Sequence, residues 1–142
     1  MKRGGEWYLI DTSVIHRQAV PAVSDRVATL GTERPLYRCA VIDLEILSSA
    51  TSAANYEDRR AMVVAGYAGL TITPAVMTQA LKSQRLFAAT GRHRAATLGD
   101  FIIAACAQVH DAVVVHYDND FDVIADVTGQ PVESVVPAGS FA

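Results

Sequence analysis

Four carboxylates lie against the most apolar segments of this chain. They are Asp11, after residues 7–10; Glu45, within residues 40–47; Asp100, before residues 101–105; and Asp118, after residues 113–117. An ionised carboxylate that is buried without a partner costs free energy, so such a group is normally paired, hydrogen-bonded or bound to a metal. Lys and Arg are absent after Arg94, so the nearby sequence offers no cation to Asp100 or Asp118. If the fold brings the four acids together, a divalent cation is their natural partner.

Each acid also has an ordinary structural interpretation. Asp100 and Asp118 precede stretches that we expect to be helical, and Asp is among the preferred residues at a helix N-cap. Asp11 could be a turn or cap residue in the same way. Glu45 shares an expected helix with Asp43, and helical periodicity alone does not decide which of the two faces the interior. Considered singly, the acids leave both interpretations open.

Other metal-binding patterns fail on their spacing. Residues 118–122 carry acids at alternate positions, as the start of an EF-hand calcium loop does, but that loop needs Gly at its sixth position and Glu at its twelfth. Val123 and Gly129 stand at those positions. The histidines are scattered, which disfavours a zinc site. They are His16, His93, His110 and His116.

Length and composition indicate one globular domain over residues 1–142. A chain of 142 residues with 51% hydrophobic and 19% charged residues can bury a substantial core and is not typical of a disordered protein. The net charge of −3 argues against binding nucleic acid over the whole surface. A local basic patch remains compatible with it.

The sequence favours a cytoplasmic protein without a membrane segment. Cys39 and Cys106 lie far apart in apolar surroundings and are expected to be small core residues, which indicates a reducing compartment. The apolar run near the start ends at Asp11 after four residues, whereas a signal peptide needs about 7 to 15. No stretch approaches the roughly 18 to 20 apolar residues of a membrane span.

Short apolar strands alternate with helices along the chain. We expect strands at 7–10, 36–39, 70–73, 112–116 and 131–136, and helices at 24–30, 40–50, 56–68, 74–90, 101–109 and 119–127. This alternation predicts an α/β fold with a parallel sheet that is covered on both faces. Ligands of such sheets bind beyond the carboxyl ends of the strands, where Asp11 and Asp118 are expected to lie.

Taken together, these motifs resemble a known family. Asp-Thr-Ser follows the first strand, Glu45 lies in a helix, Gly-Asp-Phe-Ile-Ile-Ala-Ala begins at residue 99, and His-Tyr-Asp-Asn-Asp-Phe-Asp follows a valine-rich strand. The combination resembles the PIN domain, and specifically the VapC toxins of bacterial toxin–antitoxin pairs, from Leu9 to about Val135. The resemblance implies a three-layer α/β/α sandwich with a mainly parallel sheet of four to five strands.

The resemblance also implies the roles of particular residues. It makes the four acids catalytic metal ligands, selects Glu45 over Asp43, lets Asp120 replace or assist Asp118, and gives the Ser13 hydroxyl an orienting role. The implied site comprises Asp11, Glu45, Asp100, Asp118, Asp120 and Ser13. Ligands that are all oxygen atoms suit Mg²⁺, with Mn²⁺ as an alternative.

A basic rim is expected beside these acids, because phosphates would otherwise be repelled. Arg94 resembles a basic position that precedes the third acid in some family members. The candidates for phosphate contact are Arg85, Arg92, His93 and Arg94.

The expected function is that of a metal-dependent endoribonuclease that cleaves tRNA or ribosomal RNA and so blocks translation. The resemblance implies a homodimer that is neutralised by a small VapB-like antitoxin. The first alternative is a non-catalytic PIN module that binds RNA or a protein, and such a module would be expected to have lost one or more of the acids. A phosphatase with a nucleophilic Asp-x-Asp motif is disfavoured, because the residue two after Asp11 is Ser13.

Overall fold

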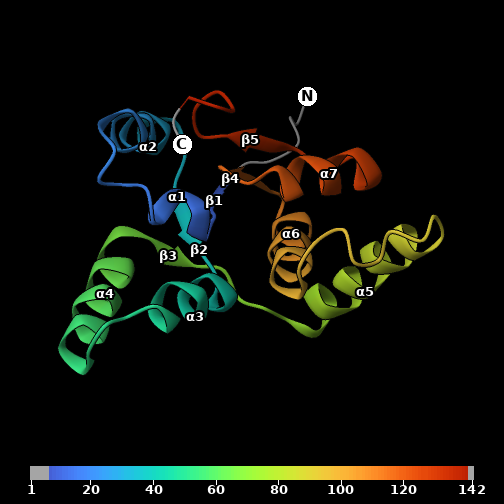
Figure 1. The fold of residues 1–142 in the computed structure, drawn as a ribbon, viewed down its shortest axis with the longest axis horizontal. Coiled ribbons are helices and arrows are strands. Elements are labelled where there is room, and N and C mark those ends of the chain that lie inside the picture. The colour runs from blue at the N-terminus through green and yellow to red at the C-terminus, as the bar shows by residue number, and fades with distance from the viewer. Residues whose placement is uncertain (1–6, 141–142) are drawn as a thin grey trace.

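The computed structural model describes residues 7–140, which form a parallel sheet surrounded by helices (Figure 1). The sheet has the order β3-β2-β1-β4-β5, and each neighbouring pair is parallel. The strands are β1 (Trp7–Ile10), β2 (Leu36–Arg38), β3 (Ala68–Gly69), β4 (Ala112–His116) and β5 (Val132–Ser134). The helices are α1 (Thr12–Ile15), α2 (Pro21–Glu33), α3 (Ala40–Ser48), α4 (Ala53–Gly66), α5 (Pro74–Ala88), α6 (Leu98–His110) and α7 (Asn119–Thr128).

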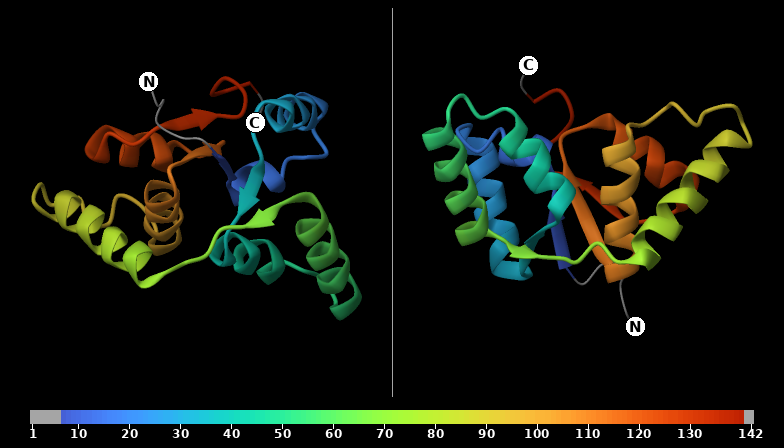
Figure 2. Two further views of the ribbon diagram at one scale, coloured as in Figure 1. Left: turned by 180° about the vertical axis from the view of Figure 1, so that it is seen from behind. Right: turned by 90° about the horizontal axis from the view of Figure 1, so that it is seen from below.

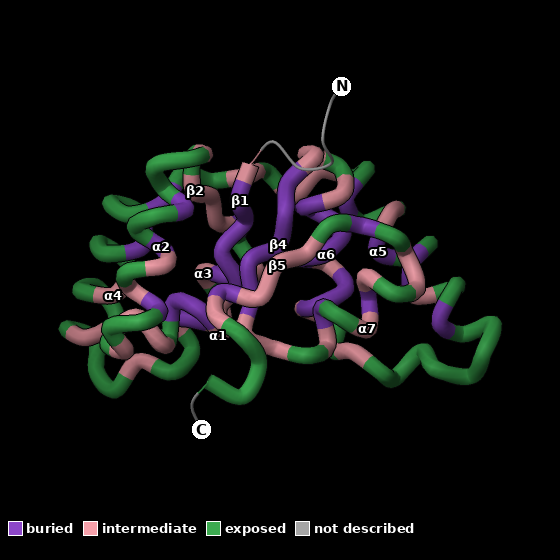
Figure 3. The backbone as a smooth tube through the Cα atoms, turned by 90° about the horizontal axis from the view of Figure 1, so that it is seen from above, coloured by how far each residue is buried: buried purple, intermediate pink, exposed green. Residues whose placement is uncertain are grey.

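The molecule has three layers. Helices α2, α3 and α4 cover one face of the sheet, and α5, α6 and α7 cover the other (Figure 2, right). The α/β sandwich and the parallel sheet predicted from the sequence are therefore confirmed. Every residue of the interior strand β4 is buried, which is the expected burial of a strand covered on both faces (Figure 3).

The register of the two central strands sets the position of the acids. Trp7 pairs with Ala112 and Ile10 with Val115, so β1 and β4 end at nearly the same level. The backbone N–H of Asp11 continues this pairing by donating to the carbonyl of Val115 at 2.9 Å. The chain leaving both strands thus enters the same edge of the sheet, as expected for a parallel α/β fold.

Several elements differ from the sequence prediction. The short helix α1 was not predicted, and α4 and α6 each begin three residues earlier than expected. The strand expected at 70–73 is instead the short β3, and residues 70–73 form an extended connection to α5. Helix α2 runs to Glu33 through Gly31, where the sequence predicted its end. Apolar residues on its inner face, including Leu30, are buried in the core, and this packing outweighs the low helix propensity of one glycine.

The start of α6 corrects one interpretation of Asp100. The N-cap is Thr97, whose hydroxyl accepts a hydrogen bond from the backbone N–H of Asp100 at 3.1 Å. Capping therefore does not explain the Asp100 carboxylate, which lies in the first turn. Asp11 and Asp118, in contrast, do cap α1 and α7 by accepting from the N–H groups of Ser13 and Asp120.

The cysteines are core residues, as predicted. Cys39, at the start of α3, and Cys106, in α6, are both free and buried, and each thiol shifts the pKa of the other. Within residues 7–140, none of the helices is long and apolar enough to cross a membrane.

Candidate metal centre

Three carboxylates meet where α6 and α7 begin. One carboxylate oxygen from each of Asp100, Asp118 and Asp120 lies within 4.8 Å of the other two. These are the acids of residues 7–140 that the structure places as a possible metal-binding group. The sequence left open whether Asp118 or Asp120 is the fourth acid of the site. In the structure both carboxylates belong to the group.

Asp100 is the most deeply buried member of this group. Its side chain is only 6% exposed, and its Oδ2 atom is buried without a hydrogen-bond partner. Burial, together with the neighbouring carboxylates of Asp120, Asp118 and Asp11, raises the pKa of Asp100 to about 7. An orphaned carboxylate oxygen among other acids is costly in a protein interior, and a cation would relieve that cost.

Ser13 connects Asp11 to the strand that leads to Asp118. Asp11 is 3% exposed, and its Oδ2 accepts hydrogen bonds from the Ser13 backbone N–H at 3.0 Å and the Ser13 hydroxyl at 2.6 Å. The Ser13 oxygen in turn accepts from the N–H of Tyr117 at 2.9 Å. Burial raises the pKa of Asp11 to about 6, partly offset by the bonds from Ser13. The hydroxyl therefore ties together the chain ends beyond β1 and β4.

Glu45 faces this centre and Asp43 does not. The hydroxyl of Thr12 donates to Oε1 of Glu45 at 2.8 Å, and the charge of Glu45 contributes to the raised pKa of Asp11. A Cβ atom at Gly99 would lie 3.2 Å from Oε2 of Glu45, so the glycine leaves room for this carboxylate beside α6. Asp43 instead pairs with Arg38.

The centre thus contains five acids at two levels of closeness. Asp100, Asp118 and Asp120 form the compact group. Asp11 lies close enough for its charge to raise the pKa of Asp100, and the charge of Glu45 in turn raises the pKa of Asp11. The positive N-terminal ends of α6 and α7 point at the same place, which favours negative charge or bound anions there.

His116 holds the backbone at the start of α7 in place. Its Nδ1 accepts the backbone N–H of Asp118 at 3.1 Å, so the proton of the neutral ring lies on Nε2, 3.3 Å from Oδ1 of Asp122. Burial lowers the pKa of His116, although the charges of Asp122 and Asp118 act in the opposite direction. The neutral ring is therefore favoured, and it fixes the peptide that carries Asp118.

Besides His116, the sequence analysis missed Thr12 and Arg17 as supporting residues. Thr12 holds Glu45, and Arg17 donates to the Ser13 carbonyl at 2.7 Å while its guanidinium lies 5.3 Å from the ring centre of Tyr117. Thr12 lies inside the Asp-Thr-Ser motif and could have been noticed there. Nothing in the sequence marks Arg17, because its contact with Tyr117 depends on the pairing of distant segments.

The basic residues expected beside the acids lie in different parts of the structure. Arg94 and His93 line a cavity that also contains Asp120. Arg92 lies over the ring of Phe87, with its guanidinium carbon 5.6 Å from the ring centre. Arg85 lines another depression on α5, together with Lys82, Leu86 and two further residues. The structure therefore brings Arg94 and His93 to the acidic centre and leaves Arg85 apart from them.

Comparison with known families decides what this arrangement belongs to. The model of the PIN domain matches residues 8–127. Ribonuclease VapC51 of Mycobacterium tuberculosis is 40% identical over 133 residues, covering 94% of this chain and 96% of the relative. The chain is a PIN domain of the VapC group. Ribonuclease VapC18 of the same organism is 37% identical over 136 residues, with 94% and 98% coverage.

Solved structures agree with the fold of this PIN domain. The VapBC2 structure from Rickettsia felis, bound to a promoter DNA fragment, superposes with a TM-score of 0.75 at 10% identity, covering 89% of this chain and 96% of that chain. The VapBC-1 structure from nontypeable Haemophilus influenzae gives 0.73 at 19% identity, with 90% and 97% coverage. At these identities the likeness concerns the fold.

The residues of this PIN domain fit a divalent cation. PIN nucleases generally use a divalent metal, and the compact acid group offers only oxygen ligands, one of them without any protein partner. Small, hard cations such as Mg²⁺ and Mn²⁺ prefer such ligands and keep part of their water shell. Cys39 and Cys106 are buried, and neither belongs to the possible metal-binding group found among residues 7–140, so its ligands are all hard oxygen atoms.

Removing the divalent metal should make this PIN domain more stable in mild acid than at neutral pH. The pKa values of Asp11 and Asp100 are raised in the fold to about 6 and about 7, from an ordinary 3.8. The folded state therefore binds these protons more tightly than the unfolded chain. This stabilisation is fully present below the unfolded pKa and is lost as pH rises through the folded values. We expect the protein in EDTA to melt on the order of 5 °C higher at about pH 5 than at about pH 7.5.

The controls isolate the acids from other titrating groups. Adding Mn²⁺ at the higher pH should recover most of the difference in melting temperature. The bound cation then offsets the repulsion between the acids, as protonation does at the lower pH. In Asp100→Asn, the dependence on pH should shrink, and thermal melts of both proteins would measure this. An equally steep dependence in that variant would contradict the assignment.

Proposed function

We propose that this protein is the toxin of a type II toxin–antitoxin pair and acts as a divalent-metal-dependent endoribonuclease on tRNA or ribosomal RNA. The observation that carries the proposal is the unpartnered Oδ2 of Asp100 within the group that it forms with Asp118 and Asp120. The ribonuclease names of relatives near 40% identity support the same activity. We also propose that the protein acts in the cytoplasm, where these RNAs are found.

Asp100, Asp118 and Asp120 would hold Mg²⁺, or Mn²⁺ as an alternative, and Asp11 and Glu45 would complete the acidic surroundings. Such an ion, when bound, lowers the pKa of a coordinated water and stabilises negative charge on phosphoryl oxygens. Glu45 and Asp11 are kept in place by the hydroxyls of Thr12 and Ser13. The network thus limits side-chain movement around the reacting phosphate.

The basic loop before α6 would counter the negative charge of the substrate. Arg94 and His93 line the cavity that includes Asp120, so they are the groups we assign to phosphate contact. Arg92 would hold the loop against Phe87 as well as adding charge at its outer edge. Arg85 lies on α5, in a different depression from Arg94 and His93. It would therefore contact only an RNA long enough to extend past Lys82.

The partners we propose are a VapB-like antitoxin and a second copy of this chain. The structural neighbours include VapBC complexes, which supports an antitoxin partner. An apolar groove between α5 and α6 is lined by Met77, Leu81 and Leu98, and the last two are 66% and 72% exposed. Exposed apolar surface of this kind suits a protein interface, and we assign it to the homodimer.

The proposal is tested by incubating the purified protein with tRNA and ribosomal RNA in Mn²⁺ or Mg²⁺ and mapping the new RNA ends. We expect discrete cleavage that EDTA abolishes. Expression of the protein should arrest growth, and co-expression of the proposed VapB-like antitoxin should relieve the arrest. RNA that is bound but uncut at every metal concentration would instead establish the non-catalytic module.

A further inference from the structure

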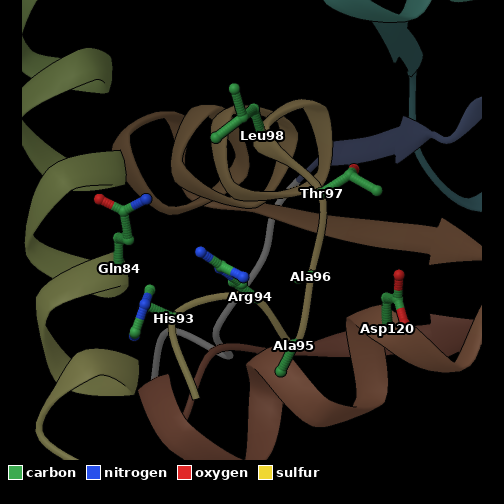
Figure 4. Close-up of a pocket in the computed structure, with 8 residues that line it drawn as sticks. All are labelled: Gln84, His93, Arg94, Ala95, Ala96, Thr97, Leu98 and Asp120. Atoms are coloured by element: carbon green, nitrogen blue, oxygen red, sulfur yellow. The ribbon is translucent and has the colours of Figure 1, made fainter. Parts of the chain in front are cut away.

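A cavity of about 500 Å³ adjoins the metal centre. It lies between α5, the loop that precedes α6 and the start of α7 (Figure 4). Arg94 lies near the middle of the view, with Gln84 and His93 to one side and Asp120 to the other (Figure 4). The volume is within the usual range of about 300 to 1,000 Å³ for small-molecule sites, so a single nucleotide unit can enter.

Two lining residues connect this cavity to the acids. Asp120 belongs both to the cavity wall and to the compact group with Asp100 and Asp118. Thr97 also lines the cavity, and its hydroxyl accepts the N–H of Asp100. A molecule held in the cavity would therefore lie beside Asp120, one of the three acids of the compact group.

The lining combines the chemistries that a nucleotide needs. Arg94 supplies a cation for a phosphate and is the last Lys or Arg in a chain of net charge −3. The amide of Gln84 carries both donors and an acceptor, which suits the edge of a base.

We propose that this cavity binds the nucleotide adjoining the scissile bond, with Arg94 at its phosphate and Gln84 at its base, so that Gln84 sets part of the cleavage preference. The inference rests on the proposed ribonuclease function and adds to it the place where sequence is read. Single-stranded RNA is the form that fits, because its unstacked bases expose the edges that an amide can recognise.

The test of Gln84 uses a pool of single-stranded RNA with random sequence, the full-length protein and Mn²⁺. Sequencing the product ends gives the base preference on each side of the cut. In Gln84→Ala we expect the preference at one flanking position to fall roughly ten-fold, with total cleavage largely retained. Gln79→Ala is the matched control, because Gln79 lies on the same helix but lines a different depression.

The test of Arg94 measures binding, so it does not depend on turnover. Fluorescence anisotropy follows a labelled RNA 12-mer on the Asp100→Asn protein, with and without Arg94→Gln. We expect the added substitution to weaken binding by about 5- to 10-fold for all sequences alike and to lower the salt dependence by about one ion. Arg60→Gln removes the same charge from α4, where Arg60 pairs with Glu57, and should change binding by less than about two-fold.

The outcomes separate this inference from the function it rests on. Cleavage by the wild-type protein with an unchanged preference in Gln84→Ala overturns the inference but leaves the ribonuclease intact. Absence of metal-dependent cleavage by the wild type overturns both. If both variants cut and bind RNA normally but bind the proposed VapB-like antitoxin more weakly, the cavity belongs to the antitoxin and the inference fails.

Discussion

Asp100→Asn should reduce RNA cleavage by more than about 100-fold while leaving the protein folded. Replacing residues that only support metal ligands commonly costs about 10- to 100-fold, so loss of a direct ligand should cost more. Asn keeps the size of the side chain but cannot supply the anionic oxygen that is left unpartnered at Oδ2. The measurement is the initial rate of RNA cleavage over a range of Mn²⁺ concentrations.

The folded state of Asp100→Asn provides the first check on that result. Removing a buried charge from among Asp118, Asp120 and Asp11 should keep or raise the melting temperature without metal, since burial and repulsion raise the pKa of Asp100. Asp126→Asn is the matched control, because Asp126 is exposed on α7, the helix that Asp118 caps. Its cleavage rate should stay within about two-fold of the wild type. Full activity in Asp100→Asn would exclude the proposed centre.

The sequence was most informative where a local pattern and the fold agree. Apolar runs of four or five residues predicted β1 and β4, and their parallel pairing places Asp11 and the Asp118 segment at one edge of the sheet. This inference needed only the rule that parallel strands end together. The N-caps at Asp11 and Asp118 were also readable, since Asp before a helix is a common cap.

Other parts of the centre depend on contacts between distant segments. Glu45 and Asp43 are equivalent in the sequence pattern, and what separates them in space is the hydroxyl of Thr12 on one side and Arg38 on the other. The family resemblance chose Glu45, which periodicity could not do. The role of Asp100 was obscured for a different reason: Thr97 takes the cap, so the Asp100 carboxylate is left for the centre.

Tertiary packing likewise separates the basic residues. Arg85, Arg92 and Arg94 are close in sequence, yet Arg92 lies on Phe87 and Arg85 lines a different surface from Arg94. A chain turn between them rotates their side chains to different faces, and its geometry is set by packing between α5 and α6. The position of this loop therefore depends on the residues beneath it.

Phe87→Ala should have the largest effect on stability and should also disturb the acidic group that we propose to bind metal. Phe87 is completely buried on α5, and its ring packs edge-on against Phe101 of α6, with 5.2 Å between ring centres. Its carbonyl accepts the backbone N–H of Arg92 at 2.8 Å, so the same residue anchors the loop that carries Arg94. Truncating a buried Phe to Ala typically costs about 3 to 5 kcal/mol, because the lost contacts leave a cavity.

We therefore expect the urea midpoint of Phe87→Ala to fall by an amount equivalent to about 3 to 5 kcal/mol, with the slope of the transition unchanged. Leu86→Ala is the control, because its neighbouring side chain is 52% exposed and should cost less than about 1 kcal/mol. Phe101 directly follows Asp100, so the cavity beneath it should also loosen the carboxylate. At temperatures where the variant is still folded, it should need more Mn²⁺ for half-maximal cleavage than Leu86→Ala does. Equal metal requirements in the two variants would show that α5 stabilises the fold without positioning the acids.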